Sequence, residues 1–303
     1  MRDDFLTTAH ESGRTGYREI VSSFHRPNGR TMIAAHRGDW RHAPENSLAA
    51  IQYSIVARAD LIEIDVQQTR DGAFVLMHDE TVDRMTNGSG AVADMTLAEL
   101  RALRLRPYQG GSAKLLTNYT IPTLEEVMIL VRNKVMINLD KCWRWRDDIY
   151  PILERTGTVQ QTLFKSTAEP EEIHRFIHSV DEQPLYMHIL DSTNEQHAVQ
   201  IEEICRYVKP QAVEICFERA DSPLVAPDVL HAIQQHHCRL WVNTMWDSLC
   251  ASQSELGDAE VNWQAHRQQG FNIIQTDEAE KLRRYLDEVE HADRMAQRSV
   301  KVE

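Results

Sequence analysis

The sequence lacks the features that mark several specialised protein classes. No run approaches the roughly 18 to 20 consecutive apolar residues that span a bilayer, and the opening segment MRDDFLTTAHESGRTGYREI has no apolar signal-peptide core. Its 5 cysteines are scattered and form no C-x-x-C pair, so neither a disulfide framework nor a zinc site is indicated. We therefore expect a cytoplasmic protein with reduced thiols and no stable membrane insertion.

Basic residues are too few for a general nucleic-acid binder. Lys and Arg number 33 against 46 Asp and Glu, which gives a formal net charge of −13. Nucleic-acid binding proteins need a basic face that neutralises phosphates. The composition thus favours a small-molecule substrate, bound where local positive charge outweighs the overall field.

A repeated alternation of short apolar runs with helical stretches predicts the fold. Eight strands, mostly separated by enough chain for a crossover helix, fit a (β/α)₈ TIM barrel over residues 31–303, preceded by an N-terminal arm at 1–30. The charged C-terminal stretch DEAEKLRRYLDEVEHADRMAQ predicts a solvated helix, which is one candidate surface for a homodimer. The predicted strands are Thr31–His36, Leu61–Val66, Val135–Asp140, Thr162–Lys165, Leu185–Leu190, Ala212–Phe217, Arg239–Thr244 and Asn272–Thr276.

One segment does not fit the alternation. LIEIDVQQTRDGAFVLMHDE contains two strand-like runs around Asp71-Gly72, a dipeptide favoured in tight hairpin turns. With those two residues as the turn, Asp65 faces His78 across the hairpin. Residues from about 80 to 133 exceed a usual crossover, so we expect a small insertion there, over one end of the barrel.

Three carboxylates are candidate metal ligands. Glu63 and Asp65 stand at i and i+2 on a strand and therefore share a face. Asp140 ends the next barrel strand, and the C-terminal strand ends of a barrel converge on one face. Like charges at one place need a cation, and oxygen ligands favour a hard divalent ion, Mg²⁺ first and Ca²⁺ second. Taken singly, these acids also fit ion-paired, surface or helix-capping roles.

Two histidines and an arginine suggest phosphodiester chemistry. Such cleavage needs a base for the attacking oxygen and an acid for the leaving alkoxide, tasks that His36 and His78 can share. Arg37 offers a planar fork for phosphate. In the PENSLAAI segment, Asn46 and Ser47 supply cap oxygens for the following helix, and Glu45 and Asn46 either serve only that cap or also brace the histidine loop.

These motifs resemble those of the glycerophosphodiester phosphodiesterase family. The matching stretches are AHRG with PENSLAAI, then ADLIEIDVQQTRDGAFVLMHDETVDRMTNGSG, IPTLEEVM and FNIIQTDEAEKL, dense from about 31 to 140 and thin thereafter. The resemblance implies a TIM barrel that hydrolyses glycerophosphodiesters to glycerol phosphate and an alcohol. It implies that His36 and His78 are the catalytic pair, that Arg37 contacts phosphate, and that Glu63 and Asp65 bind a divalent cation with an acid on the third strand.

The sequence departs from the commoner family pattern at that third strand. The family usually has a glutamate followed two positions later by a phosphate-binding lysine, whereas NLDKCW has Asp140 and then Cys142. Lys165, at the next strand end, is the favoured substitute. Lys141 is the other candidate, although strand alternation predicts that it points away from the barrel axis.

Several alternatives remain open from the sequence. Tryptophans 143, 145, 241 and 246 either line the alcohol side of the site, where a cationic alcohol would suit them, or simply pack in the core. Lysophospholipase D or sphingomyelinase D chemistry would require an exposed apolar rim, and no basic amphipathic segment indicates one. A catalytically silent phosphate-ligand binder would be marked by loss of a histidine or an acid, and none is lost.

Overall fold

Eight parallel strands close into a barrel in the computed structural model, which describes residues 16–217, 219, 221–245 and 259–300. Neighbouring strands pair in the order β1-β9-β8-β7-β6-β5-β4-β2, and β1 also pairs with β2, which closes the ring. A short strand, β3, adds antiparallel to β2 outside the ring. The predicted TIM barrel is confirmed. The strands are β1 Met32–His36, β2 Leu61–Gln68, β3 Phe74–Leu76, β4 Met136–Asp140, β5 Thr162–Ser166, β6 Leu185–Leu190, β7 Ala212–Ile215, β8 Arg239–Asn243 and β9 Ile273–Thr276.

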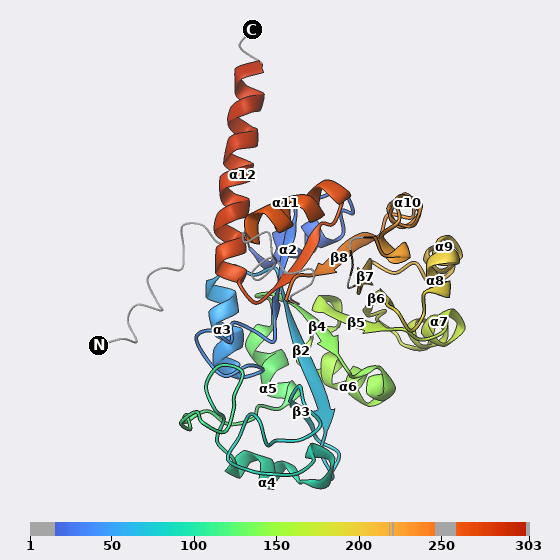
Figure 1. Cartoon of the computed structure of the whole chain (residues 1–303). Helices are drawn as coiled ribbons and strands as arrows, with labels where there is room; N and C mark the ends of the chain where they lie inside the picture. Colours follow the sequence, from blue (N-terminus) through green and yellow to red (C-terminus); the bar gives the residue numbers. More distant parts are fainter. Residues whose placement is uncertain (1–15, 218, 220, 246–258, 301–303) are drawn as a thin grey trace.

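Helices surround the barrel and separate its strands (Figure 1). No helix among the described residues is long and apolar enough to cross a bilayer. The expected N-terminal arm includes a helix at Tyr17–Phe24, while the arm's first fifteen residues, together with Trp246 and Cys250, lie outside the described residues. The helices are α2 Tyr17–Phe24, α3 Leu48–Val56, α4 Leu97–Ala102, α5 Leu124–Val131, α6 Arg146–Thr156, α7 Pro170–Ser179, α8 Gln196–Val199, α9 Ile201–Val208, α10 Pro227–Gln235, α11 Ala259–Gln269 and α12 Ala279–Val300.

The barrel interior changes from apolar to polar along the strands. Its lower layer is a cluster of buried apolar side chains that includes Met32, Leu61 and Trp241, and α2 covers this layer with Ile20 and Phe24. Two residues further along the strands, the inward positions are polar and buried. They are Glu63, Asn138, Lys165, Glu214, Asn243 and Gln275. Because the apolar layer and α2 fill one end, the polar end at the strand C-termini is the end available for a site.

The hairpin register differs from the prediction by one residue. The pairs are Val66 with Leu76 and Gln68 with Phe74, so Met77 lies opposite Asp65 and its N–H donates to the Asp65 carbonyl at 3.1 Å. The prediction that Asp65 faces His78 was wrong. The turn holds three residues, 70–72, between the bonded Thr69 and Ala73, rather than two, and Gly72 takes a positive φ of 83°.

The segment expected as an insertion contains two parts that pack differently. Residues around α4 form a separate apolar cluster with β3, which includes Val75, Met85 and Ile121, whereas α5 packs in the main core between barrel and helices. Both α4 and α5 start at a capping box, Thr96 with Glu99 and Thr123 with Glu126. Figure 1 shows the α4 part beyond the end of β2, at the opposite end of the molecule from the free end of α12.

Candidate active site

The three predicted metal ligands lie together at the C-terminal ends of β2 and β4. Ligand oxygens of Glu63, Asp65 and Asp140 are all within 4.8 Å of one another, because β2 and β4 pair in register with Asp65 opposite Asp140. Burial first, and then the charges of Asp65 and Asp140, raise the pKa of Glu63 well above its ordinary value. Three oxygen donors in a partly buried cluster of like charge fit a hard divalent cation.

Two lysines partly neutralise this cluster. The Lys165 ammonium on β5 is buried and lies 3.2 Å from Asp140 Oδ2 and 3.1 Å from Glu214 Oε2. Burial alone would lower the pKa of Lys165, but Asp140, Glu214 and Glu63 outweigh it and raise that pKa. Burial alone would raise the pKa of Asp140. The charge of Lys165, together with the N–H and the charge of Lys141, outweighs that effect and holds the pKa of Asp140 below its usual value.

Lys141 also reaches the site, contrary to the expectation from strand alternation. The strand ends at Asp140, and Lys141 takes a left-handed conformation with φ of 60°. Its ammonium therefore turns inward, donates to the His78 carbonyl at 2.6 Å and lies 3.6 Å from Asp65 Oδ1. Alternation holds only while the chain remains extended, so the ammonium groups of both lysines lie beside the carboxylate cluster.

His36 is held by an aspartate from the far end of the sequence. It ends β1, and its Nδ1 lies 2.8 Å from Oδ1 of Asp277, which directly follows β9. The Trp40 indole N–H donates to the same oxygen at 2.7 Å. A carboxylate bound to Nδ1 of the neutral ring fixes the tautomer in which Nε2 is the basic nitrogen.

His78 is oriented in the same way by its neighbour in sequence. Its Nδ1 lies 2.7 Å from Asp79 Oδ1, and Arg84 donates to both oxygens of that carboxylate at 2.7 and 2.9 Å. The Arg84 hydrogen bonds, aided by that from His78 and opposed by partial burial, hold the pKa of Asp79 well below its usual range. The ionised form of Asp79 is therefore strongly favoured over the protonated form.

The loop after β1 is fixed by buried polar side chains. Ser47 is the N-cap of α3 and accepts from the Ala50 N–H, whereas Asn46 does not cap. Asn46 instead donates to Asp65 Oδ2 at 2.8 Å and accepts from the Asp65 N–H at 3.1 Å. Glu45 binds both Arg37 and Arg84. Glu45 and Asn46 thus brace the histidine loop, which was one of the two alternatives left open by the sequence.

Arg37 lies directly above the carboxylates. Its backbone N–H donates to Glu63 Oε2 at 3.0 Å, and its guanidinium contacts Glu45 at 3.2 Å. Its Nε is buried, makes no hydrogen bond within the described part of the chain and lies 3.6 Å from Asp65 Oδ2. The close approach depends on Gly38, where a φ of 77° and an Ala50 backbone carbon 2.9 Å from an added Cβ leave no room for another residue.

Several polar residues near the site were missed by the sequence analysis. Glu214 binds Lys165 and accepts from Asn243 Nδ2 at 2.7 Å, and Gln275 donates to Asn243 Oδ1 at 3.0 Å. Each stands at an inward position on its strand, two residues after an apolar one. That spacing is visible in AVEIC, LWVNT and IIQTD, but it identifies a barrel interior only once the strands are known to form a barrel.

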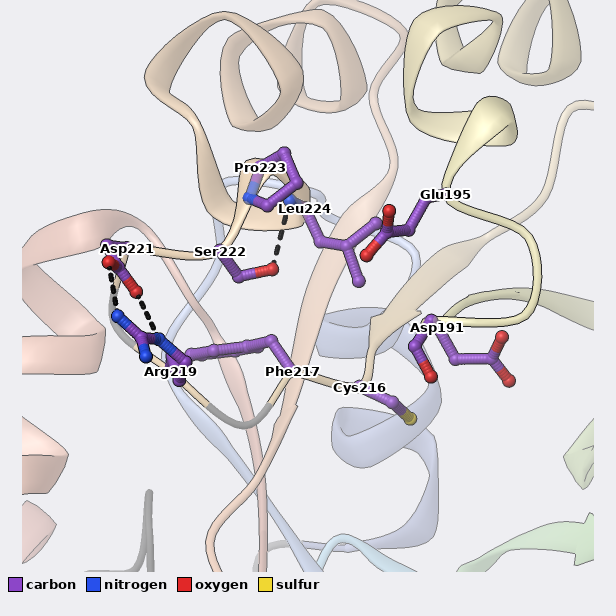
Figure 2. Close-up of a pocket in the computed structure, with 10 residues that line it drawn as sticks. Asp191, Glu195, Cys216, Phe217, Arg219, Asp221, Ser222, Pro223 and Leu224 are labelled. Atoms are coloured by element: carbon purple, nitrogen blue, oxygen red, sulfur yellow. Dashed lines mark hydrogen bonds and ion pairs between the residues drawn. The ribbon is translucent and has the colours of Figure 1, made fainter.

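A cleft of 690 Å³ lies on the same face, after β6 and β7. Figure 2 shows Asp191 and Glu195 on one side and the Arg219–Asp221 ion pair across from them. Cys216 in its lining accepts a hydrogen bond from the Asn243 amide, which connects the cleft to the polar layer of the barrel. None of the site residues predicted from sequence lines this cleft.

The described tryptophans pack within the protein. Trp143 contacts the rings of Phe164 and Phe176 and donates to Glu172. Trp241 is buried in the lower barrel layer. Trp241 is therefore a core residue, whereas Trp143 and Trp145 are partly buried and pack against the core, Trp145 on the Phe74 ring.

Comparison with known proteins agrees with the geometry. A profile of the Glycerophosphoryl diester phosphodiesterase family matches residues 36–280. The glycerophosphodiester phosphodiesterase of Caldanaerobacter subterraneus subsp. tengcongensis is 44% identical over 112 residues, which are 37% of this chain and 45% of that protein. Glycerophosphodiester phosphodiesterase 1 of Homo sapiens is 41% identical over 106 residues, 34% of this chain and 31% of that protein.

Solved structures match a larger share of the chain than these two relatives do. The chain spans less than half of the length of either relative. A crystal structure of a glycerophosphoryl diester phosphodiesterase from Parabacteroides distasonis has a TM-score of 0.69 and 21% identity, and covers 91% of this chain and 93% of that one. That similarity concerns the fold. With the family profile across most of its length, the chain belongs to the glycerophosphoryl diester phosphodiesterase family.

Proposed function

We propose that the protein hydrolyses glycerophosphodiesters to glycerol phosphate and an alcohol. The observation that supports this most directly is the convergence of two carboxylate-oriented histidines and a three-carboxylate cluster at one barrel end. A divalent cation held by Glu63, Asp65 and Asp140 would supply Lewis-acid stabilisation of charge on the phosphoryl group. Mg²⁺ is the proposed ion, and Ca²⁺ is the alternative.

The surrounding cations give the site its affinity for phosphate. The Arg37 Nε, which lies 3.6 Å from Asp65 Oδ2, and the ammonium groups of Lys141 and Lys165 lie next to the carboxylates. We propose that Arg37 and Lys165 bind the phosphate, with Lys141 contributing as a third charge. The cleft beside Cys216 offers space for the departing alcohol.

We propose His36 as the general base and His78 as the general acid. When His36 accepts a proton, the negative charge of Asp277 balances the new positive charge on the ring. The only other group that we describe as donating to that Asp277 oxygen is the Trp40 indole, which is neutral. The partner of His78, Asp79, already neutralises the cation Arg84. In the reaction, His36 Nε2 removes a proton from water or from the glycerol 2-hydroxyl, that oxygen forms a new P–O bond, the P–O bond to the alcohol breaks, and His78 protonates the departing oxygen. Attack by the 2-hydroxyl gives a cyclic phosphate, which a water molecule then opens to glycerol phosphate.

A catalytically silent binding role is disfavoured by the completeness of the constellation. Each histidine is bonded to an aspartate, and the ligand oxygens of all three acids lie within 4.8 Å of one another. A binding protein would need the cations but not two oriented rings.

The test is turnover of glycerophosphocholine, glycerophosphoethanolamine and lysophosphatidylcholine, with Mg²⁺, with Ca²⁺ and after chelation. We expect metal-dependent release of glycerol phosphate, reduced by roughly a thousandfold or more in His36→Ala and His78→Ala. His42→Ala is the matched control, since His42 lies on the loop that follows His36, but its ring bonds Asp39 and packs on Tyr53. Turnover that persists in both catalytic variants, or absence of turnover with any of these diesters despite bound metal, would refute the proposal.

A further inference from the structure

A basic segment protrudes from the insertion beside the site. Between residues 100 and 124 the sequence has four basic residues and no acidic one, in a chain with a net charge of −13. Arg101 pairs with Glu126. In the described part of the chain, no carboxylate lies within ion-pair distance of Arg104, Arg106 or Lys114. We call residues 104–119 the basic loop.

The basic loop also exposes large apolar side chains. Leu115 is 87% exposed and Leu116 46%, and the tyrosines 108 and 119 are 43% and 44% exposed. Single exposed apolar residues are common on proteins, but here four occur within twelve positions among basic residues. The segment is a loop and not the basic amphipathic helix that the sequence lacks, but leucine and tyrosine next to Lys and Arg are the side chains that bind the headgroup region of lipid layers.

The loop is internally ordered, with Leu115 and Leu116 in the stretch between its two ends. The Leu105 carbonyl accepts from the Thr117 N–H, and the Leu105 N–H donates to the Tyr119 carbonyl, both at 2.9 Å. These two backbone hydrogen bonds close the loop at its base. The Lys114 ammonium lies 5.3 Å from the Tyr108 ring centroid. The Arg106 guanidinium donates to the Lys114 carbonyl at 2.5 Å, so it supports the loop from within. Arg104 and Lys114 remain the outward charges.

The base of the loop touches the residues that orient His78. The Tyr108 carbonyl accepts from the Glu45 N–H at 2.9 Å, and the Gln109 carbonyl accepts from Arg84 at 2.6 Å. Arg84 is the residue that holds Asp79. A surface bound by the loop tip would therefore lie next to the mouth of the barrel, on the side where Figure 1 shows the insertion.

We propose that the basic loop docks the protein reversibly on an anionic lipid surface, with Leu115 and Leu116 in the headgroup region and Arg104 and Lys114 on lipid phosphates. Charge complementarity favours this occupant. A tip of about twelve residues is small for a protein partner, since standard interfaces use roughly 20 to 30 residues a side. The docking does not rest on the proposed reaction, because it requires no turnover.

The test is co-sedimentation of the full chain with vesicles of equal parts phosphatidylglycerol and phosphatidylcholine, and with pure phosphatidylcholine. We expect binding to the anionic vesicles, roughly tenfold or more weaker binding to the neutral ones, and release at about 1 M NaCl. The double variant Leu115→Asp, Leu116→Asp should lose at least about tenfold in affinity. Val199→Asp is the matched control, because Val199 is 89% exposed on α8 and far from the loop in sequence.

Three outcomes would overturn the proposal. The first is failure of the unchanged protein to sediment with anionic vesicles at low salt. The second is equal binding by the double variant, or an equal loss in Val199→Asp. The third is concentration-dependent self-association in light scattering that the double variant abolishes, which would make the tip a protein interface. Thermal denaturation of each variant checks the fold, and the high exposure of Leu115 predicts no change there.

Discussion

Divalent metal binding is expected to expel one proton from the carboxylate cluster. Burial and the charges of Asp65 and Asp140 raise the pKa of Glu63, whereas Lys165 and Lys141 lower that of Asp140. Of these two carboxyls, Glu63 is therefore the one that binds a proton more readily without metal. A metal ligand must be deprotonated, so affinity should rise with pH until the raised pKa of Glu63 is passed. One proton per ion corresponds to roughly tenfold in affinity per pH unit, or about 1.4 kcal/mol.

The assay is isothermal titration of Mg²⁺ at a series of pH values, in two buffers of different ionisation enthalpy. The dependence of the observed heat on the buffer gives the number of protons released. In Glu63→Gln the side chain has no proton to lose, so the pH slope should fall to near zero and binding should weaken. Tight binding with no proton release in the unchanged protein would refute the assignment of the proton, and no binding at any pH would refute the metal site.

Three further predictions concern the supports of the site and a buried histidine. Asp277→Asn should reduce kcat/KM by roughly a hundredfold, because an amide holds the histidine Nδ1–H less well, and an unchanged rate would show that this orientation is dispensable. Gly110→Ala should destabilise the fold by roughly 1 to 3 kcal/mol in urea denaturation, since its Cβ would lie 2.4 Å from the Arg84 carbonyl oxygen. Gly111→Ala is the control, because Gly111 also has a positive φ but an added Cβ there meets no atom. The difference between the two variants measures the clash apart from the backbone strain. Burial, then His197, lowers the pKa of His188 to about 3, so the unfolded chain binds the extra proton between that value and its ordinary pKa of about 6.5. The free energy of unfolding should therefore decrease as the pH is lowered through this window, by about 2 kcal/mol from pH 7 to pH 5. In urea denaturation, His188→Gln should lose this part of the pH dependence. An unchanged pH dependence in that variant would contradict the burial argument.

The barrel was predictable because parallel strands buried on both faces are nearly continuous apolar runs. The stretch Leu185–Leu190 was predicted with its observed bounds, and Ala212–Phe217 ends two residues earlier, at Ile215. Each run is bounded by polar or turn residues, so its length separates it from the helices. The placement of the three acids at one barrel end then followed from strand direction alone.

The two geometric errors both arise where a strand ends. The hairpin register was deduced from a two-residue turn, whereas the turn holds three residues, and the direction of Lys141 was deduced by extending strand alternation past the last residue of the strand. At both points a residue takes a positive φ, Gly72 at 83° and Lys141 at 60°. A lysine in that conformation has no sequence signature, because asparagine and glycine are the residues that favour it.

The histidine partners illustrate a different limit. Asp79 follows His78 directly, yet its role depends on Arg84 and Glu45, which the fold brings together. Asp277 lies 241 positions from His36. Local patterns predict which residues end on the same barrel face, but side-chain contacts between strand ends depend on packing that no local pattern encodes.

The closure of the ring by β1 and β9 has a consequence for synthesis of the protein on the ribosome. The strand that bears His36 is among the first made, while its neighbour β9 and the Asp277 carboxylate are made near the end. Contacts between such distant segments form late and slowly. A nascent chain would hold its histidine pair, carboxylates and cations for most of translation without being able to assemble them. The active site should therefore form only when the barrel closes, and chains that end before residue 277 should be inert even where their earlier strands fold.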